Sequence, residues 1–168
     1  MEMTKRVFFN RCFLGCLAIG CLVLTTSLLA VHVFHLKPCT MCKLQRIPFA
    51  LLILNASFGL ATSYKMGFFR VIQGCFIIGA LLGSTHFLIQ MGALPDPCVS
   101  QKGLSTAQEF SQMLKTAKCS DIAWSFLGIP ISLMNFALCS LVFWITLKKF
   151  RDLDSKTKGS KMTNSKQF

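Results

Sequence analysis

Residues 12–36 read CFLGCLAIGCLVLTTSLLAVHVFHL, an apolar stretch without a Lys, Arg, Asp or Glu. Only His32 and His35 could carry a charge within it. Such a stretch predicts a transmembrane helix, because in lipid a backbone must pair its own amides. A secretory signal peptide is the alternative interpretation. Its apolar core would be only about 7–15 residues long, and no clear A-x-A cleavage site follows here.

Three further apolar segments, 47–63, 71–94 and 126–147, predict three more helices. Segment 47–63 would cover roughly 25 Å as a helix, which is short of a hydrocarbon core of about 30 Å. We therefore expect the residues just before it to complete the crossing, with Pro48 kinking or interrupting the helix at the junction. The fold class predicted is an all-α membrane protein, a four-transmembrane-helix bundle.

The composition of the 168 residues agrees with a membrane protein of one domain, 1–168. Hydrophobic residues make up 53% and charged residues 14% of the chain, and its mean hydropathy is +0.57. A soluble domain has about 45–50% apolar and about 25% charged residues. The composition therefore argues against a soluble domain.

The basic residues predict the orientation of the bundle. Of 18 Lys and Arg residues, 12 lie in the N-terminal tail, the turn before residue 71 and the basic tail 148–168, and six in the loops 37–46 and 95–125. Cytoplasmic loops carry the excess of Lys and Arg, so both termini are expected in the cytoplasm and both loops outside. The net charge of +12 is weak evidence for nucleic-acid binding, since no recognition motif accompanies it.

The second outer loop, 95–125, predicts a short amphipathic helix of its own. Ser105 and Gln108 fit a capping box, and apolar residues then recur at helical spacing: Ala107, Phe110, Leu114 and Ala117. The helix could lie on the membrane surface or pack against the bundle.

Nine cysteines are present, and their positions divide them into two groups. Five lie in apolar segments, where we expect small packing residues: Cys12, Cys16, Cys21, Cys75 and Cys139. The other four lie in the two outer loops: Cys39, Cys42, Cys98 and Cys119. An outside face is the oxidising one, where disulfides persist. These four are therefore the candidates for disulfide chemistry.

The stretch 37–50, KPCTMCKLQRIPFA, carries the first pair. If a helix begins at Cys39, Cys39 and Cys42 share one face, and the positive helix end lowers the pKa of a thiol there. Arg46, one turn further on, could stabilise a thiolate or an anion on a bound acceptor; a snorkelling interfacial arginine is the alternative.

Two other interpretations of the cysteines remain open from their spacing. His32, His35, Cys39 and Cys42 have ligand types and a count that would suit zinc. Cys98 and Cys119 alone could be a structural staple across their loop. Together, the two pairs could instead relay electrons by thiol–disulfide exchange from an outer dithiol to a lipid-soluble acceptor beside Cys42.

The blocks K-P-C-T-M-C-K-L-Q-R-I-P and D-I-A-W-S-F-L-G-I-P, with a cysteine pair between them, resemble the bacterial disulfide bond formation protein B family, DsbB. The resemblance covers roughly residues 10–147. It implies a four-helix protein of the bacterial cytoplasmic (inner) membrane. Such a protein is a thiol:quinone oxidoreductase that reoxidises a periplasmic or extracytoplasmic DsbA-like thioredoxin-fold oxidase and passes electrons to ubiquinone or menaquinone.

The resemblance also implies a role for each site residue. Cys98 would receive the partner's thiolate, Cys119 would exchange with Cys39, and Cys42 would deliver electrons to quinone. Disulfides Cys39–Cys42 and Cys98–Cys119 are then expected in the resting protein. Arg46 matches the family's quinone-proximal arginine.

His86 matches a histidine of some family members only loosely, and a buried or interfacial histidine is the simpler interpretation. Two functional alternatives stay open. One is a tetraspan membrane scaffold with structural disulfides. The other is an enzyme like vitamin K epoxide reductase, in which the Cys-x-x-Cys pair would follow the loop cysteines rather than precede them.

Overall fold

The computed structural model describes residues 2–36, 38–96, 119–120, 125–126 and 128–165. Five helices and two short strands lie within these ranges: α1 (Glu2–His32), α2 (Thr40–Leu44), α3 (Arg46–Ala61), α4 (Lys65–Gln90), β1 (Ser125–Phe126), β2 (Ile129–Pro130) and α6 (Ile131–Ser165). The amphipathic helix expected in the second outer loop falls outside these ranges.

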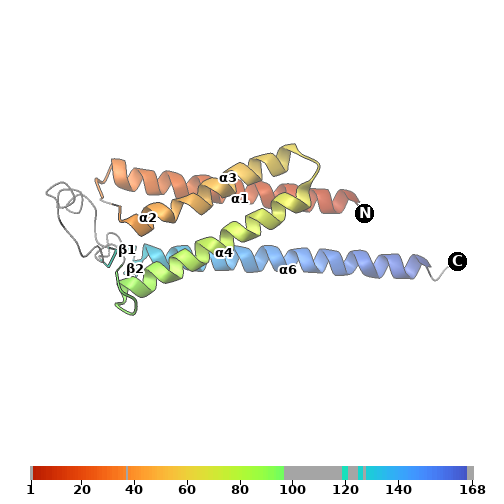
Figure 1. The fold of residues 1–168 in the computed structure, drawn as a ribbon. Coiled ribbons are helices and arrows are strands. Elements are labelled where there is room, and N and C mark those ends of the chain that lie inside the picture. The colour runs from red at the N-terminus through yellow and green to blue at the C-terminus, as the bar shows by residue number, and fades with distance from the viewer. Residues whose placement is uncertain (1, 37, 97–118, 121–124, 127, 166–168) are drawn as a thin grey trace.

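The long helices form an elongated bundle (Figure 1). α1 packs along α3, α3 packs on α4, and α4 packs along α6. Both termini and the turn between α3 and α4 lie at one end of the bundle, whereas α2, β1 and β2 lie at the other (Figure 1). The all-α four-helix architecture predicted from the apolar segments is confirmed.

Among the described residues, four stretches are long and apolar enough to cross a membrane: Thr4–His32, Thr40–Ala61, Lys65–Gln90 and Ile131–Ser155. Their outer surfaces carry large exposed apolar side chains, among them Leu22, Phe58, Leu81 and Trp144. An apolar surface this extensive is foreign to a monomeric soluble protein. It suits contact with lipid.

The second crossing is assembled from α2 and α3, as expected from its length. The two helices are separated by the single residue Gln45. Pro48 lies in the first turn of α3, where its missing N–H removes no intrahelical hydrogen bond within α3. The interruption at Gln45 lies three residues before Pro48, and Gln45 itself keeps a right-handed helical conformation.

The third helix ends at Gln90, four residues earlier than the apolar pattern indicated. Gly92 has φ +75°. Its N–H donates to Ile89 O at 3.0 Å, and the N–H of Ala93 donates to Leu88 O at 2.9 Å. These two bonds form a Schellman motif, which a glycine in the left-handed region makes possible. A local cap, rather than hydrophobicity, terminates α4.

The fourth helix begins at Ile131, not at 126 as expected. The preceding residues form an antiparallel hairpin in which Ser125 pairs with Pro130 and Phe126 with Ile129. Gly128 in its turn has φ +80°, a conformation that glycine adopts without steric cost. Residues 125–126 and 129–130 thus form a small β-ribbon that leads into α6, which the all-α prediction did not include.

The outer helices are longer than the apolar pattern indicated at the end that holds the termini. α1 begins at Glu2 rather than near residue 12, and α6 continues to Ser165, through most of the tail 148–168. Charged and polar residues do not terminate a helix where it leaves the hydrocarbon. Hydropathy marks the membrane crossing, and the helices extend beyond it.

The main core includes a group of phenylalanines from α1, α4 and α6 that pack together toward the end of the bundle that holds the termini. Phe9 contacts Phe69 edge to face, with ring centroids 5.5 Å apart, and Phe69 lies 5.3 Å from Phe150. Three of the apolar-segment cysteines are buried in this core, as expected for packing residues: Cys16, Cys75 and Cys139. Cys12 packs against it, whereas Cys21 is exposed.

Candidate functional site

The two cysteines of the C-T-M-C segment lie at the start of α2. Cys39 is the N-cap residue, and its sulfur accepts the N–H of Cys42 at 3.2 Å. The Cys39 thiol donates to the sulfur of Cys42 at 2.8 Å, well beyond a disulfide bond of about 2.05 Å. The two sulfurs are in contact without an S–S bond, and the expected Cys39–Cys42 disulfide stays a prediction.

The pKa of Cys39 is raised to about 12, because its thiol donates a hydrogen bond to Cys42 and because it is buried. The expectation that the helix end lowers the pKa is thus wrong for this residue. Burial disfavours the charged thiolate, and the shared proton adds to that effect. Cys39 is held as the neutral member of the pair.

His86 of α4 lies directly against the pair, although the sequence matched it only loosely. It is 3% exposed, and its Nε2 lies 3.7 Å from the sulfur of Cys39. Its Nδ1 lies 3.2 Å from Nε2 of Gln45, which also donates to Leu82 O at 3.2 Å. Because an amide nitrogen only donates, Nδ1 accepts and the imidazole proton sits on Nε2, facing Cys39.

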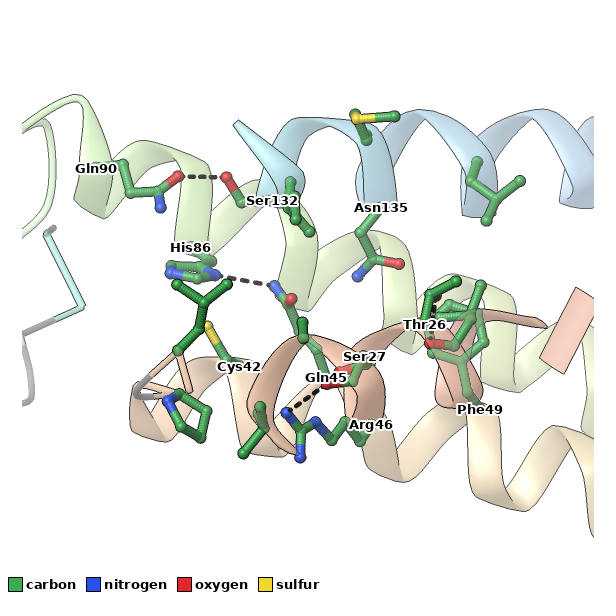
Figure 2. A pocket seen from close by; sticks show the side chains of 18 residues that line it. Thr26, Ser27, Cys42, Gln45, Arg46, Phe49, His86, Gln90, Ser132 and Asn135 are labelled. Carbon is green, nitrogen blue, oxygen red and sulfur yellow. Dashed lines mark hydrogen bonds between the residues drawn. The ribbon is translucent and has the colours of Figure 1, made fainter. Parts of the chain in front are cut away.

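A cavity of about 520 Å³ opens beside Cys42 (Figure 2). α1, α3, α4 and α6 all contribute to its wall, which is mostly apolar. Its polar lining residues are Thr26, Ser27, Cys42, Gln45, Arg46, His86, Gln90, Ser132 and Asn135. An apolar cavity with a few convergent polar groups is the usual form of a small-molecule site.

Two donors in this cavity are left without partners. Arg46 donates through Nη2 to Ser27 O at 3.4 Å, but its Nε is buried and has no hydrogen-bond partner in the described part of the chain. The same is true of Nδ2 of Asn135. Buried donors are normally satisfied. Both residues line the cavity, so these unsatisfied donors belong to its wall.

The far side of the cavity is held by a contact between α4 and α6. Ser132 donates to Oε1 of Gln90, and both side chains line the cavity (Figure 2). Ser132 is 2% exposed. This bond fixes the start of α6, just after the hairpin, against α4 and thereby closes the cavity wall opposite α3.

The second cysteine pair is described in part. Cys119 is fully buried, is disulfide-bonded, and packs in one small cluster with Cys39 and Ile89. Asp96 accepts the N–H of Ser120 at 3.0 Å, which ties the end of this loop to its beginning. Cys98, the other predicted site residue, lies outside the described residues. The structure therefore brings Cys39, Cys42 and Cys119 together, with Arg46 lining the cavity beside Cys42.

The structure groups other residues than those of the zinc site that the sequence suggested. Within the described ranges, the cysteine pair is grouped with His86, not with His32 or His35. Both of those histidines are exposed; His32 is the last residue of α1, and His35 follows the helix. The residues that sequence spacing missed are thus His86, Gln45 and Asn135, which reach the site through helix packing.

Comparisons with known proteins agree with this geometry. The family described as "Disulfide bond formation protein DsbB" matches residues 9–148. Disulfide bond formation protein B 2 of Pseudomonas putida is 29% identical over 144 residues, which cover 77% of this chain and 85% of that protein. Disulfide bond formation protein B of Mannheimia succiniciproducens is 30% identical over 146 residues, 78% and 82% of the two chains. The chain belongs to the DsbB family of multi-pass membrane proteins of disulfide bond formation.

Proposed function

We propose that this protein oxidises a DsbA-like thioredoxin-fold dithiol outside the cytoplasm and passes the electrons to a quinone in the bacterial inner membrane. The observation that carries the proposal is the position of Cys42. One side of the Cys39–Cys42 pair packs with the disulfide-bonded Cys119. The other side lines a cavity within the membrane-crossing helices.

The proposed transfer begins in the second loop. A partner thiolate attacks Cys98 of a Cys98–Cys119 disulfide and forms a mixed disulfide with it. The partner's second thiol then attacks this mixed disulfide, which frees the Cys98 thiolate and leaves the partner oxidised. Cys119 leaves as a thiolate and attacks Cys39 of a Cys39–Cys42 disulfide. Cys98 next attacks Cys119 and restores the loop disulfide. The net result is one oxidised partner and two thiols at Cys39 and Cys42.

The size and the mostly apolar lining of the cavity support a quinone, either ubiquinone or menaquinone, as the acceptor. The unpartnered Nε of Arg46 and Nδ2 of Asn135 are two buried donors suited to carbonyl oxygens. When bound, a quinone supplies an acceptor for two electrons and two protons. Arg46 and Asn135 would orient its head group, the apolar wall would exclude water, and His86 would hold a proton at Nε2 beside Cys39.

The orientation supports an extracytoplasmic reaction. Both termini lie at one end of the bundle and the Cys-x-x-Cys turn at the other (Figure 1). If the basic tails remain in the cytoplasm, the cysteine end faces the periplasm or the exterior.

Turnover of purified protein tests the proposal. In detergent, a reduced thioredoxin-fold dithiol should be oxidised only when a quinone is present. Cys42→Ser should abolish quinone reduction and still react with the partner. Cys98→Ser should abolish reaction with the partner. Cys75→Ser, which alters a buried cysteine of the core, is the matched control. Normal turnover in either site variant would refute the assigned roles.

The quinone site is tested separately at Asn135. Asn135→Leu should raise the KM for quinone roughly 2–12-fold, the equivalent of one hydrogen bond of about 0.5–1.5 kcal/mol. Asn55→Leu is the control, because Asn55 is half-buried on α3, does not line the cavity, and donates to its own helix at Leu51 O. An unchanged KM in Asn135→Leu would exclude this residue from quinone binding.

A further inference from the structure

A group of three metal-ligating side chains coincides with the cysteine pair. The ligand atoms of Cys39, Cys42 and His86 all lie within 4.8 Å of one another. Cys39 and His86 are almost fully buried, and Cys42 and His86 line the cavity. Two cysteines and a histidine are a soft ligand set of the kind that binds Zn²⁺ with one position open.

We propose that the reduced Cys39–Cys42 pair and His86 bind a thiophilic divalent cation, Zn²⁺ in the cell, and that the cation blocks reoxidation of the pair. On binding, each thiol releases its proton, two sulfur–metal bonds and one nitrogen–metal bond form, and no electron is transferred. The binding itself requires only these three side chains. Its effect on turnover rests on the proposed function.

The geometry is close to what a tetrahedral ion requires. With metal–sulfur bonds of about 2.3 Å and metal–nitrogen bonds of about 2.0–2.1 Å, ligand atoms stand roughly 3.5–3.8 Å apart. The Cys39 sulfur and His86 Nε2 are already 3.7 Å apart. The two sulfurs, at 2.8 Å, must separate by about 1 Å. Loss of the S–H···S hydrogen bond and a small side-chain rotation permit that movement.

The position of the proton on the His86 ring adds a requirement for metal binding. Coordination through Nε2 needs the imidazole proton on Nδ1, the opposite tautomer from the one that Gln45 imposes. The amide of Gln45 must turn to present its oxygen and give up its bond to Leu82 O. A carboxylate in its place would accept from Nδ1 without that loss, as in the carboxylate–histidine–zinc arrangement. Gln45 therefore weakens metal binding at this site.

The redox state controls the proposed site. A disulfide between Cys39 and Cys42 has no thiolate to offer, so only the reduced pair binds the cation. A pair occupied by the cation cannot form its disulfide, and a chelator restores it. The site is thus an inhibitory one that acts after the pair has received electrons.

The test is a titration with Cd²⁺ under nitrogen, without quinone, on reduced protein carrying Cys98→Ser and Cys119→Ser. Thiolate-to-cadmium absorption in the ultraviolet should saturate at one ion per chain, and Zn²⁺ should displace it. Further changing Cys12 and Cys16 to Ser should leave the signal intact.

The ligand role of His86 is tested with variants of the same protein. His86→Gln should raise the Kd for Cd²⁺ at least tenfold. His35→Gln, which changes an exposed histidine outside the group, should leave the Kd unchanged. Gln45→Glu should lower the Kd by about tenfold or more.

A second measurement needs no change at His86. In the same reduced protein, one equivalent of Cd²⁺ should slow alkylation of Cys39 and Cys42 together, and a chelator should reverse it. Equal affinity in His86→Gln, equal binding by the oxidised pair, or no protection would overturn the proposal. Because no quinone is present, binding of Cd²⁺ by a protein that fails to reduce quinone would sink the proposed function and leave this inference standing.

Discussion

At the scale of single residues, the two cysteines of the Cys-x-x-Cys segment occupy different environments although they are three positions apart. Cys39 is 2% exposed and receives the N–H of Cys42 on its sulfur, with His86 beside it. Cys42 faces the cavity. This difference supports the proposed roles, in which Cys39 exchanges with another buried sulfur and Cys42 reacts with a bound acceptor.

The raised pKa of Cys39 predicts an unusual pH dependence of its reactivity. Only the thiolate is alkylated, so with a pKa of about 12 the thiol form of Cys39 persists through the alkaline range. Its rate of reaction with iodoacetamide should rise about tenfold per pH unit from pH 8 to pH 10. An ordinary thiol, with a pKa of about 8.5, levels off in this range.

The rate is measured by peptide mapping of reduced protein at low conversion, so that each chain is alkylated at most once. A cysteine-containing peptide added to the same sample provides the internal reference for an ordinary thiol. A plateau for Cys39 below pH 9 would show that its proton is not held in the way described here.

At the scale of elements, glycines set the distance between the helices. A Cβ at Gly83 would lie 2.9 Å from the backbone N of Phe136, and one at Gly79 would lie 2.9 Å from the sulfur of Cys139. These glycines stand four residues apart on α4 and form a G-x-x-x-G face against α6, the small-residue contact of many membrane helix pairs. This contact brings Asn135, next to Phe136, to the cavity.

Gly83→Ala should therefore destabilise the protein by about 1–3 kcal/mol, the usual result of overpacking a close contact. Gly74→Ala is the matched control in the same helix, because a Cβ there meets nothing within 4 Å. Thermal unfolding in detergent measures both. If Gly83→Ala unfolds at the same temperature as Gly74→Ala, the backbones of α4 and α6 are not held together at this position.

At the scale of the whole molecule, an even number of crossings places both termini on one side and the redox segment on the other (Figure 1). Alkaline phosphatase, which is active only after export, should be active when fused after Leu36 or Leu94 and inactive after Ser63. Fluorescent protein fused at the C-terminus should fluoresce from the cytoplasmic side. Activity after Ser63, or none after Leu94, would reverse the orientation and exclude an extracytoplasmic partner.

The sequence predicts those parts of the fold that depend on local patterns. Long apolar segments mark the crossings, and Pro48 marks the break between α2 and α3. The C-terminal end of α4 and the start of α6 depend instead on backbone conformations at Gly92 and Gly128. A hydropathy pattern does not contain this information. The hairpin before α6 was missed for the same reason.

The residues of the candidate site also divide into those that the sequence predicts and those that only the fold brings together. Cys39, Cys42 and Arg46 follow one another at helical spacing, so their proximity could be predicted from the chain. His86 and Asn135 come from α4 and α6, and only helix packing brings them to the cavity. A polar residue within an apolar crossing is the signal that could have identified both, because such residues are costly in lipid and usually functional.

The most direct test uses reduced protein with Cys98→Ser and Cys119→Ser, mixed under nitrogen with one equivalent of quinone. Quinol absorbance and peptide mapping should show one quinol formed for each Cys39–Cys42 disulfide, with two thiols lost per chain. If the quinone stays oxidised while both thiols remain open to alkylation, the cavity beside Cys42 does not receive electrons from this pair.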